Sequence, residues 1–155
     1  MGPVRARIEQ FLACRRLAFV GVSRRADDFS RAVFRELVHR GYDVVPVNEN
    51  CGEIEGHPVA PSVAAIDPPV DWALIMTSAA RAREAVEACH RAGIQRVWLH
   101  RGGGPGSVEP EALAYAERHG LEVVPGECPL MFLPDPGLVH RVHAFCKRVV
   151  GTYPG

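Results

Sequence analysis

The sequence predicts an α/β fold of the Rossmann-like, doubly wound class, in which helices cover both faces of a five-stranded parallel sheet. Two observations lead to this prediction. Short apolar runs alternate with amphipathic helical patterns along the chain, and this alternation places parallel strands in one sheet with helical crossovers between them. The length of 155 residues suits one domain, and we see no internal repeat, so we expect residues 1–155 to form a single domain.

The apolar runs predict five strands, at residues 17–22, 42–47, 70–76, 95–100 and 121–126. Apolar side chains at helical spacing predict helices at residues 3–14, 29–40, 79–92, 110–120 and about 138–150. The Gly- and Pro-rich connection at 51–69 predicts a short strand and one helical turn. We expect the strand order 3-2-1-4-5, counted along the chain, with a ligand at the carboxyl ends of the strands between strands 1 and 4.

The charge composition argues against nucleic acid as a partner. Basic and acidic residues number 18 each, whereas non-specific nucleic-acid binding requires a basic surface. Lys147 is the single lysine, so guanidinium groups or backbone N–H groups must meet any anion. The chain has no long apolar run, no signal peptide and no C-x-x-C motif among its five cysteines, so we expect a cytoplasmic protein without a membrane segment.

The loop that follows the first predicted strand has features of a phosphate site. Gly21 allows the backbone to approach an anion closely, and Ser23 offers a hydroxyl. The N–H groups near Ser30 lie at a helix N-terminus, where the helix dipole favours negative charge. Arg24 and Arg25 carry guanidinium groups that form forked hydrogen bonds to phosphate oxygens.

Two alternatives remain open for this edge of the sheet. The first is a solvated loop in which the two arginines pair with Asp27 and Asp28. The second is an NAD(P)-binding redox sensor or oxidoreductase on the same fold. A nicotinamide site requires an acidic residue at the end of the second strand and a G-x-G-x-x-G loop, but Glu49 lies two residues beyond the last apolar position and the further glycines are missing.

Other patterns give weaker signals. His140, His143 and Cys146 have metal-like spacing, but a helix places Cys146 on the apolar stripe and His140 away from it, so we expect no metal site. Cys128, directly before Pro129, is either a packed thiol or a redox-active one. We find no acid–base pair and no nucleophile elbow, and therefore expect no catalytic residues.

The segments "AFVGVSRRADDFSRAVFRELVHRGYDVVPVN" and "EIEGHPVAPSVAAIDPPVDWALIM" resemble the small stand-alone CoA-binding proteins. These proteins share a domain with the alpha subunit of succinyl-CoA synthetase and with ADP-forming acyl-CoA synthetases. The resemblance covers about residues 15–130, and its most specific parts are the loops at 21–23, 46–48, 56–63 and 128–129.

The resemblance implies a ligand, coenzyme A or an acyl-CoA, and a set of contacts for it. Residues of the first loop would cradle the pyrophosphate, and those of the second would flank the adenosine and its 3′-phosphate. Those of the third would line the adenine and ribose, and a histidine would lie further along the groove. In that order these residues are Gly21, Val22, Ser23, Arg24 and Ser30; Val47 and Asn48; Met76, Thr77 and Ser78; and His100. Arg24, Arg25 or Arg101 would have to supply the contact to the 3′-phosphate.

The resemblance does not carry over ligase activity. The synthetases use a phosphorylated histidine from a second domain, and no histidine of this chain lies in a matching motif. We therefore expect a CoA-binding protein without catalysis of its own, which forms a homodimer or serves as the CoA-binding subunit beside a ligase partner.

Overall fold

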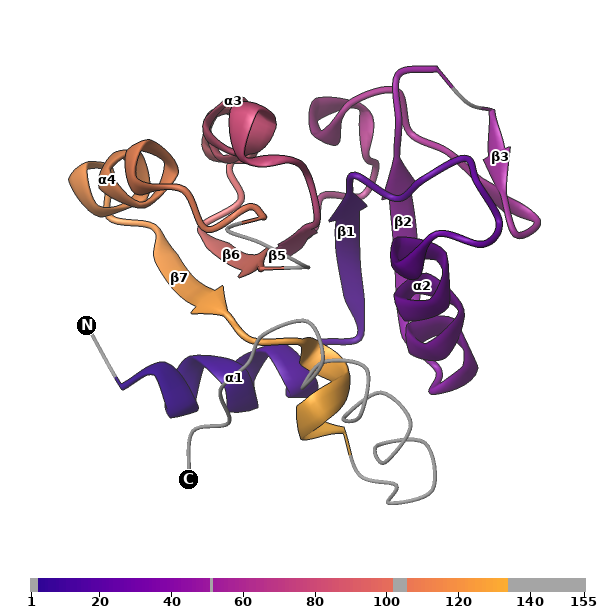
Figure 1. Cartoon of the computed structure of the whole chain (residues 1–155), viewed down its shortest axis with the longest axis horizontal. Coiled ribbons are helices and arrows are strands. Elements are labelled where there is room, and N and C mark those ends of the chain that lie inside the picture. The colour runs from indigo at the N-terminus through magenta and orange to yellow at the C-terminus, as the bar shows by residue number, and fades with distance from the viewer. Residues whose placement is uncertain (1–2, 51, 102–105, 134–155) are drawn as a thin grey trace.

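A five-stranded parallel sheet lies at the centre of the computed structural model, which describes residues 3–50, 52–101 and 106–133 (Figure 1). Its strands are β1 (Arg16–Val20), β2 (Asp43–Val47), β5 (Trp72–Ile75), β6 (Arg96–His100) and β7 (Glu122–Gly126). Every neighbouring pair in this sheet is parallel. The predicted class, a Rossmann-like doubly wound α/β fold, is confirmed.

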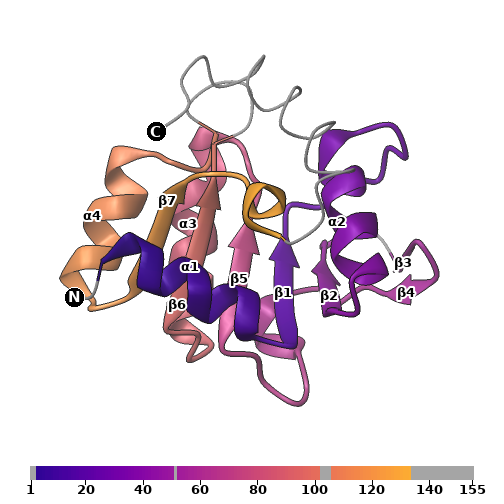
Figure 2. The ribbon, with the colours of Figure 1, turned by 90° about the horizontal axis from the view of Figure 1, so that it is seen from below.

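Helices cover both faces of the sheet, as predicted (Figure 2). One face carries α1 (Val4–Ala13) and α2 (Phe29–His39), and the other carries α3 (Ala79–Arg91) and α4 (Pro110–Arg118). These helices agree with the predicted ranges to within two residues, and the helix expected at 138–150 lies outside the described residues. None of the helices in the described ranges has the length and apolar character needed to cross a bilayer.

The connection from β2 to β5 holds more structure than the sequence predicted. Two short strands, β3 (Glu53–Ile54) and β4 (His57–Pro58), form an antiparallel hairpin, and the 3₁₀ turn η1 (Val63–Ala65) follows. The prediction had one short strand and one helical turn. At the tip of the hairpin, Glu55 and Gly56 have φ angles of 51° and 75°, as a two-residue hairpin of type I′ requires.

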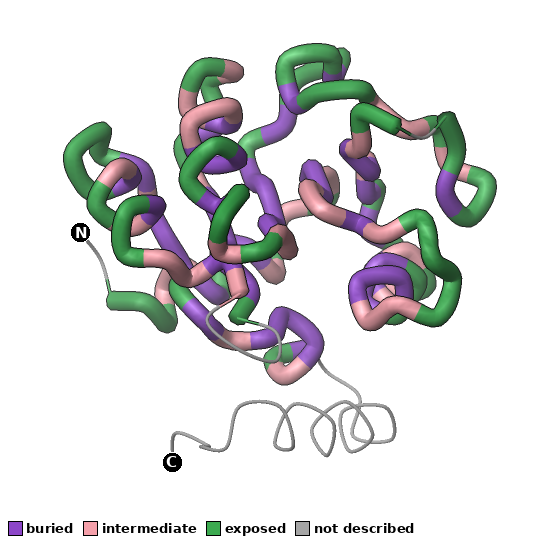
Figure 3. Tube along the Cα trace, turned by 45° about the horizontal axis from the view of Figure 1, so that its top comes forward, coloured by how far each residue is buried: buried purple, intermediate pink, exposed green. Residues whose placement is uncertain are grey.

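The two faces of the sheet support two separate hydrophobic cores. Alternate strand residues point to opposite faces, so Phe19 and Trp72 pack with α1 and α2, while Ala73 and Ile75 pack with α3 and α4. The Phe11 ring of α1 meets Trp72 edge-on at a centroid distance of 5.3 Å. Figure 3 shows the result, a buried sheet between helices whose outer faces are exposed.

The observed strand order is β2-β1-β5-β6-β7, which is 2-1-3-4-5 when the five strands are counted along the chain. The predicted order 3-2-1-4-5 is therefore wrong, and the switch point lies between β1 and β5 rather than between β1 and β6. Pro46 explains the difference. It lacks a backbone N–H, which confines β2 to an edge, whereas all four residues of β5 are buried as in a central strand. Pro125 marks β7 as the other edge strand, a position that both orders share.

Candidate functional site

Three loops meet at the carboxyl edge of the sheet, beside the switch point. They are the loops that follow β1, β2 and β5, and backbone and side-chain hydrogen bonds join them. The Met76 N–H donates to the Val20 carbonyl oxygen at 2.8 Å, and the Asn48 side-chain amide donates to the Val22 carbonyl oxygen at 3.4 Å. In this fold class, ligands bind at this place.

Gly21 lets the first and third of these loops touch. Its φ angle is 94°, a region that favours glycine, and a Cβ atom there would lie 2.6 Å from the Met76 carbonyl oxygen. The sequence assigned Gly21 to the close approach of an anion. The structure shows a close approach of a neighbouring backbone at this position, so the fold itself requires the glycine.

The first loop is held by hydrogen bonds to its own serines. The Ser23 N–H donates to the Ser30 hydroxyl oxygen at 2.9 Å, and the Arg25 N–H donates to the Ser23 hydroxyl oxygen at 3.1 Å. Ser30 is buried, and its N–H and hydroxyl both donate to the Asp28 carboxylate, at 2.8 and 2.6 Å. Ser23 and Ser30 therefore shape the loop, and Asp28 caps the N-terminus of α2.

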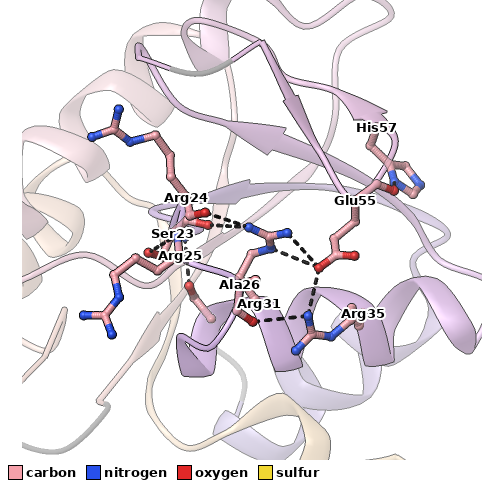
Figure 4. A network of polar contacts seen from close by, with 9 residues as sticks. Ser23, Arg24, Arg25, Ala26, Arg31, Arg35, Glu55 and His57 are labelled. Carbon is pink, nitrogen blue, oxygen red and sulfur yellow. Dashed lines mark hydrogen bonds and ion pairs between the residues drawn. The ribbon is translucent and has the colours of Figure 1, made fainter.

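The two arginines of this loop differ in their surroundings. Arg25 pairs with Asp27 at 3.0 Å, as one of the alternatives from the sequence proposed, and both side chains are about three-quarters exposed. Asp28 caps α2 instead of pairing with an arginine. The Arg24 side chain is exposed and points away from the polar network beneath the loop (Figure 4).

A buried arginine that the sequence analysis did not identify anchors this loop from below. Arg31 of α2 donates to the carbonyl oxygens of Ser23 and Arg24, at 3.3 and 3.0 Å. Its side chain is 11% exposed, and it also donates twice to one carboxylate oxygen of Glu55, at 3.1 and 2.8 Å. Arg35, one helical turn later, donates to the same oxygen at 2.8 Å (Figure 4).

This Arg31–Glu55–Arg35 network joins α2, the first loop and the β3–β4 hairpin. The hydrogen bonds from Arg31, with a contribution from Arg35, hold the pKa of the Glu55 carboxyl below its ordinary value. Arg31 and Arg35 are four residues apart and so lie on one helical face, a signal that the sequence did carry. The position of Glu55 depends on a hairpin that the sequence did not predict.

The second and third loops present small polar groups. Val47 is buried, whereas Asn48 and Thr77 are partly exposed and Ser78, which precedes α3, is exposed. A further residue absent from the predicted set, Ser107, accepts from the Thr77 N–H and donates to the Thr77 carbonyl oxygen, both at 2.9 Å. This fully buried serine fastens the third loop to the segment after β6.

His100 and Cys128 also lie in the interior. His100, at the end of β6, is 4% exposed and packs against Phe29 at the start of α2, with a ring-centroid distance of 5.7 Å. Burial lowers the pKa of His100 to about 4, so the side chain is neutral at physiological pH. Cys128 is also buried, in the core beneath α1 and α2, which agrees with a packed thiol.

A surface depression of about 440 Å³ lies beside the site, between the first turns of α3 and α4. Four glutamates line it together with one arginine, an arrangement that repels phosphate. Within the described ranges, no group of three or more histidines, cysteines or acidic residues could hold a metal ion. The His140, His143 and Cys146 pattern lies outside the described residues.

The comparison with protein families gives a match that covers the sheet and all three loops. A family model described as a CoA binding domain matches residues 15–134. The chain belongs to this family of CoA-binding domains. The resemblance inferred from the sequence is therefore confirmed.

Individual proteins share part of the sequence or the fold. A Bacillus subtilis (strain 168) protein, uncharacterized protein YneT, is 36% identical over 70 residues, which are 44% of this chain and 52% of YneT, so the match spans about half of that relative. A hypothetical protein from Pyrococcus horikoshii OT3 superposes with a TM-score of 0.73 and 25% identity. The match covers 97% of this chain and 94% of the Pyrococcus protein.

One larger protein has the same fold as a part of its chain. The dinucleotide forming acetyl-coenzyme A synthetase 1 of Ca. Korarchaeum cryptofilum superposes with a TM-score of 0.63 and 23% identity. The match covers 75% of this chain and 27% of the synthetase. At this identity the likeness establishes the fold alone.

Proposed function

We propose that the protein binds coenzyme A or an acyl-CoA at the carboxyl edge of its sheet, in the angle between the loops after β1, β2 and β5, and performs no catalysis of its own. The observation that carries this proposal is the match to the CoA-binding domain family over residues 15–134, which includes all three loops. The convergence of these loops at the switch point supports it.

In this proposal the first loop receives the pyrophosphate. Gly21, Val22 and Ser23 supply backbone groups, Ser30 keeps Ser23 in place, and the exposed Arg24 pairs with the phosphates. Anchoring the loop carbonyls to buried Arg31 leaves the opposite side of the loop to the ligand (Figure 4).

The other two loops receive the adenosine. Val47 and Asn48 lie on one side of it, and Met76, Thr77 and Ser78 lie on the other. Arg25 has a secondary role, because Asp27 already pairs with it. His100 supports the site from inside, through its packing against Phe29.

A reducing, cytoplasmic setting completes the proposal, supported by the free thiols of Cys14, Cys89 and Cys128. Burial raises the pKa of Cys14 to about 11 and that of Cys89 to about 12, which keeps both protonated and unreactive. The proposal includes a protein partner, which is either a second copy of the chain or a ligase subunit that receives CoA.

Ligand-dependent thermal stability tests the proposal against the nicotinamide alternative. The protein is unfolded in the presence of CoA, acetyl-CoA, NAD or NADP. A ligand at one hundred times its Kd stabilises the folded state by about 2.7 kcal/mol, so binding raises the unfolding midpoint measurably. We expect stabilisation by CoA and acetyl-CoA, and stabilisation by NAD without any effect of CoA contradicts the proposal.

A matched pair of variants tests the place of binding. Arg24→Ala removes an exposed guanidinium from the first loop, and Arg91→Ala removes one from the last turn of α3, which lies at the other end of the sheet. We expect the first variant to lower CoA affinity about tenfold, as the loss of one charge-assisted contact does, and the second to leave it unchanged. Equal affinities of both variants place the ligand elsewhere.

A further inference from the structure

An ion pair spans the proposed adenosine end of the site. Glu49, in the loop after β2, accepts a hydrogen bond from Arg81 in the first turn of α3, with 3.3 Å between the Nη2 and Oε1 atoms. In the sheet, β2 and β5 lie on either side of β1, and α3 follows the loop after β5. The ion pair therefore connects the loop after β2 with α3, across the end of β1.

The pair is weak enough to open. The side chains of Arg81 and Glu49 are 60% and 62% exposed, and exposed ion pairs of this kind contribute little to stability. Arg81 also lies 4.0 Å from Glu84, so its guanidinium is placed between two carboxylates without a tight forked pair to either. A phosphate dianion carries more charge and more acceptor oxygens than Glu49 and competes for Arg81 effectively.

The residues near Arg81 leave it as a basic side chain that can meet a phosphate at this end of the site. The loop after β2 reads Val47-Asn48-Glu49-Asn50 and contains no basic residue, and Arg25 is already paired with Asp27. In dinucleotide-binding folds an acidic residue in this region binds the ribose hydroxyls, and a nearby arginine accommodates a ribose phosphate. Glu49 is an acidic residue and Arg81 a basic residue of these two kinds, and their side chains are in contact with each other.

We propose that Glu49 and Arg81 together determine selectivity for a phosphomonoester on the adenosine ribose of the ligand. This inference rests on the proposed binding of coenzyme A, whose ribose carries such a phosphate. When the phosphorylated ligand binds, Arg81 leaves Glu49 and pairs with the phosphate. The freed Glu49 carboxylate repels the phosphate and thereby limits the affinity.

Calorimetric titration of the full chain with CoA and with 3′-dephospho-CoA tests the inference. The measured quantity is selectivity, the Kd of dephospho-CoA divided by the Kd of CoA. We expect Arg81→Gln to lower selectivity about tenfold, almost entirely through weaker CoA binding, because only CoA offers the phosphate. Glu49→Gln is expected to raise selectivity several-fold by removing the repulsion.

Two controls separate this role from a structural one. Arg83→Gln alters an arginine on the same helix that pairs with Glu87 and Glu111, and it is expected to leave selectivity unchanged. Added salt screens exposed charges, so wild-type selectivity is expected to fall between low and high ionic strength. Selectivity of Arg81→Gln is expected not to fall, because only the repulsion between Glu49 and the phosphate is left to be screened. Unfolding midpoints of all variants are expected to match the wild type.

The outcomes distinguish the two levels of the proposal. If the wild type binds both ligands but Arg81→Gln weakens both equally or neither, the selectivity role is refuted and CoA binding stands. If the wild type binds neither ligand, both the selectivity role and the proposed function are refuted.

Discussion

Replacing Glu55 by alanine tests whether the network beneath the first loop determines the stability of the fold. Glu55 accepts two hydrogen bonds from Arg31 and one from Arg35 through the same oxygen. Arg35 is about half exposed and regains a partner from water, so little of the cost arises there. Arg31 is 11% exposed and loses the single acceptor oxygen of two of its hydrogen bonds in a buried setting.

The magnitude follows from the burial of the two partners. Removing one member of a fully buried ion pair costs about 3–5 kcal/mol, because a charge remains without compensation. The Glu55 side chain is 28% exposed, so water replaces part of the carboxylate and reduces this cost. We expect Glu55→Ala to lower the free energy of unfolding by about 2–3 kcal/mol.

Urea unfolding at neutral pH measures this change as a shift of the midpoint at constant m-value. Asp27→Ala is the control, because it breaks an ion pair in the neighbouring loop whose partners are 77% and 75% exposed and is expected to cost less than about 0.5 kcal/mol. Equal midpoint shifts in Glu55→Ala and Asp27→Ala would show that the buried network adds no stability beyond that of an exposed ion pair. The double variant with Arg31→Leu is expected to lose less than the two single variants together, because no buried charge remains.

The stabilisation that Glu55 contributes depends on pH in a definite direction. Arg31 lowers the pKa of Glu55 below its ordinary value of 4.5, so the stabilisation is complete above that pH. It is lost as the pH falls through the lowered pKa. The difference between the wild type and Glu55→Ala is therefore expected to shrink as the pH falls below 4.5.

Three further predictions concern Gly21, Ser107 and His100. Gly21→Ala forces a Cβ into the backbone of the loop after β5 at a φ of 94°, and should cost at least about 2 kcal/mol in thermal unfolding. Ser107→Ala leaves the Thr77 N–H without its acceptor and should cost about 1–3 kcal/mol, whereas the exposed Ser62→Ala should cost almost nothing. His100, whose pKa is about 4, should show no NMR titration between pH 7 and 5. The free energy of unfolding should fall as the pH is lowered from about 6.5 to 4, because His100 takes up a proton in the unfolded chain but not in the folded one. This fall should reach up to about 1.4 kcal/mol per pH unit.

The fold class could be predicted because it depends on local patterns. Each strand of the central sheet and each α-helix in the described ranges has its own local sequence pattern, and their alternation restricts the architecture to a parallel sheet. The strand order depends on which strands become neighbours, and several orders satisfy the same alternation. Pro46 marked β2 as an edge strand in the sequence, and its missing N–H group was the signal that could have corrected the order.

The candidate site was only partly predictable for a related reason. The rule that ligands bind at strand ends selects loops, and the structure does bring those after β1, β2 and β5 together. The rule does not say which side chains of a loop face inward. Ser30 and His100 are buried, and Arg31 depends on Glu55, which lies 24 residues away in a hairpin without a strong turn motif.

The single glycine after β1 shows why some substitutions cannot report on ligand binding. A loop with one glycine suggests that the glycine exists for the ligand, but the Gly21 backbone packs directly against Met76. Any side chain at this position disturbs the junction of the two loops whether or not a ligand binds. Loss of CoA binding by a Gly21 variant would therefore have two causes that the measurement cannot separate. Arg24 and Arg81 are exposed, so their replacement removes charge from the surface and leaves the loop junction intact. Binding measurements on these two arginines consequently test the ligand, while stability measurements on Gly21, Arg31 and Glu55 test the scaffold that holds the loops in place.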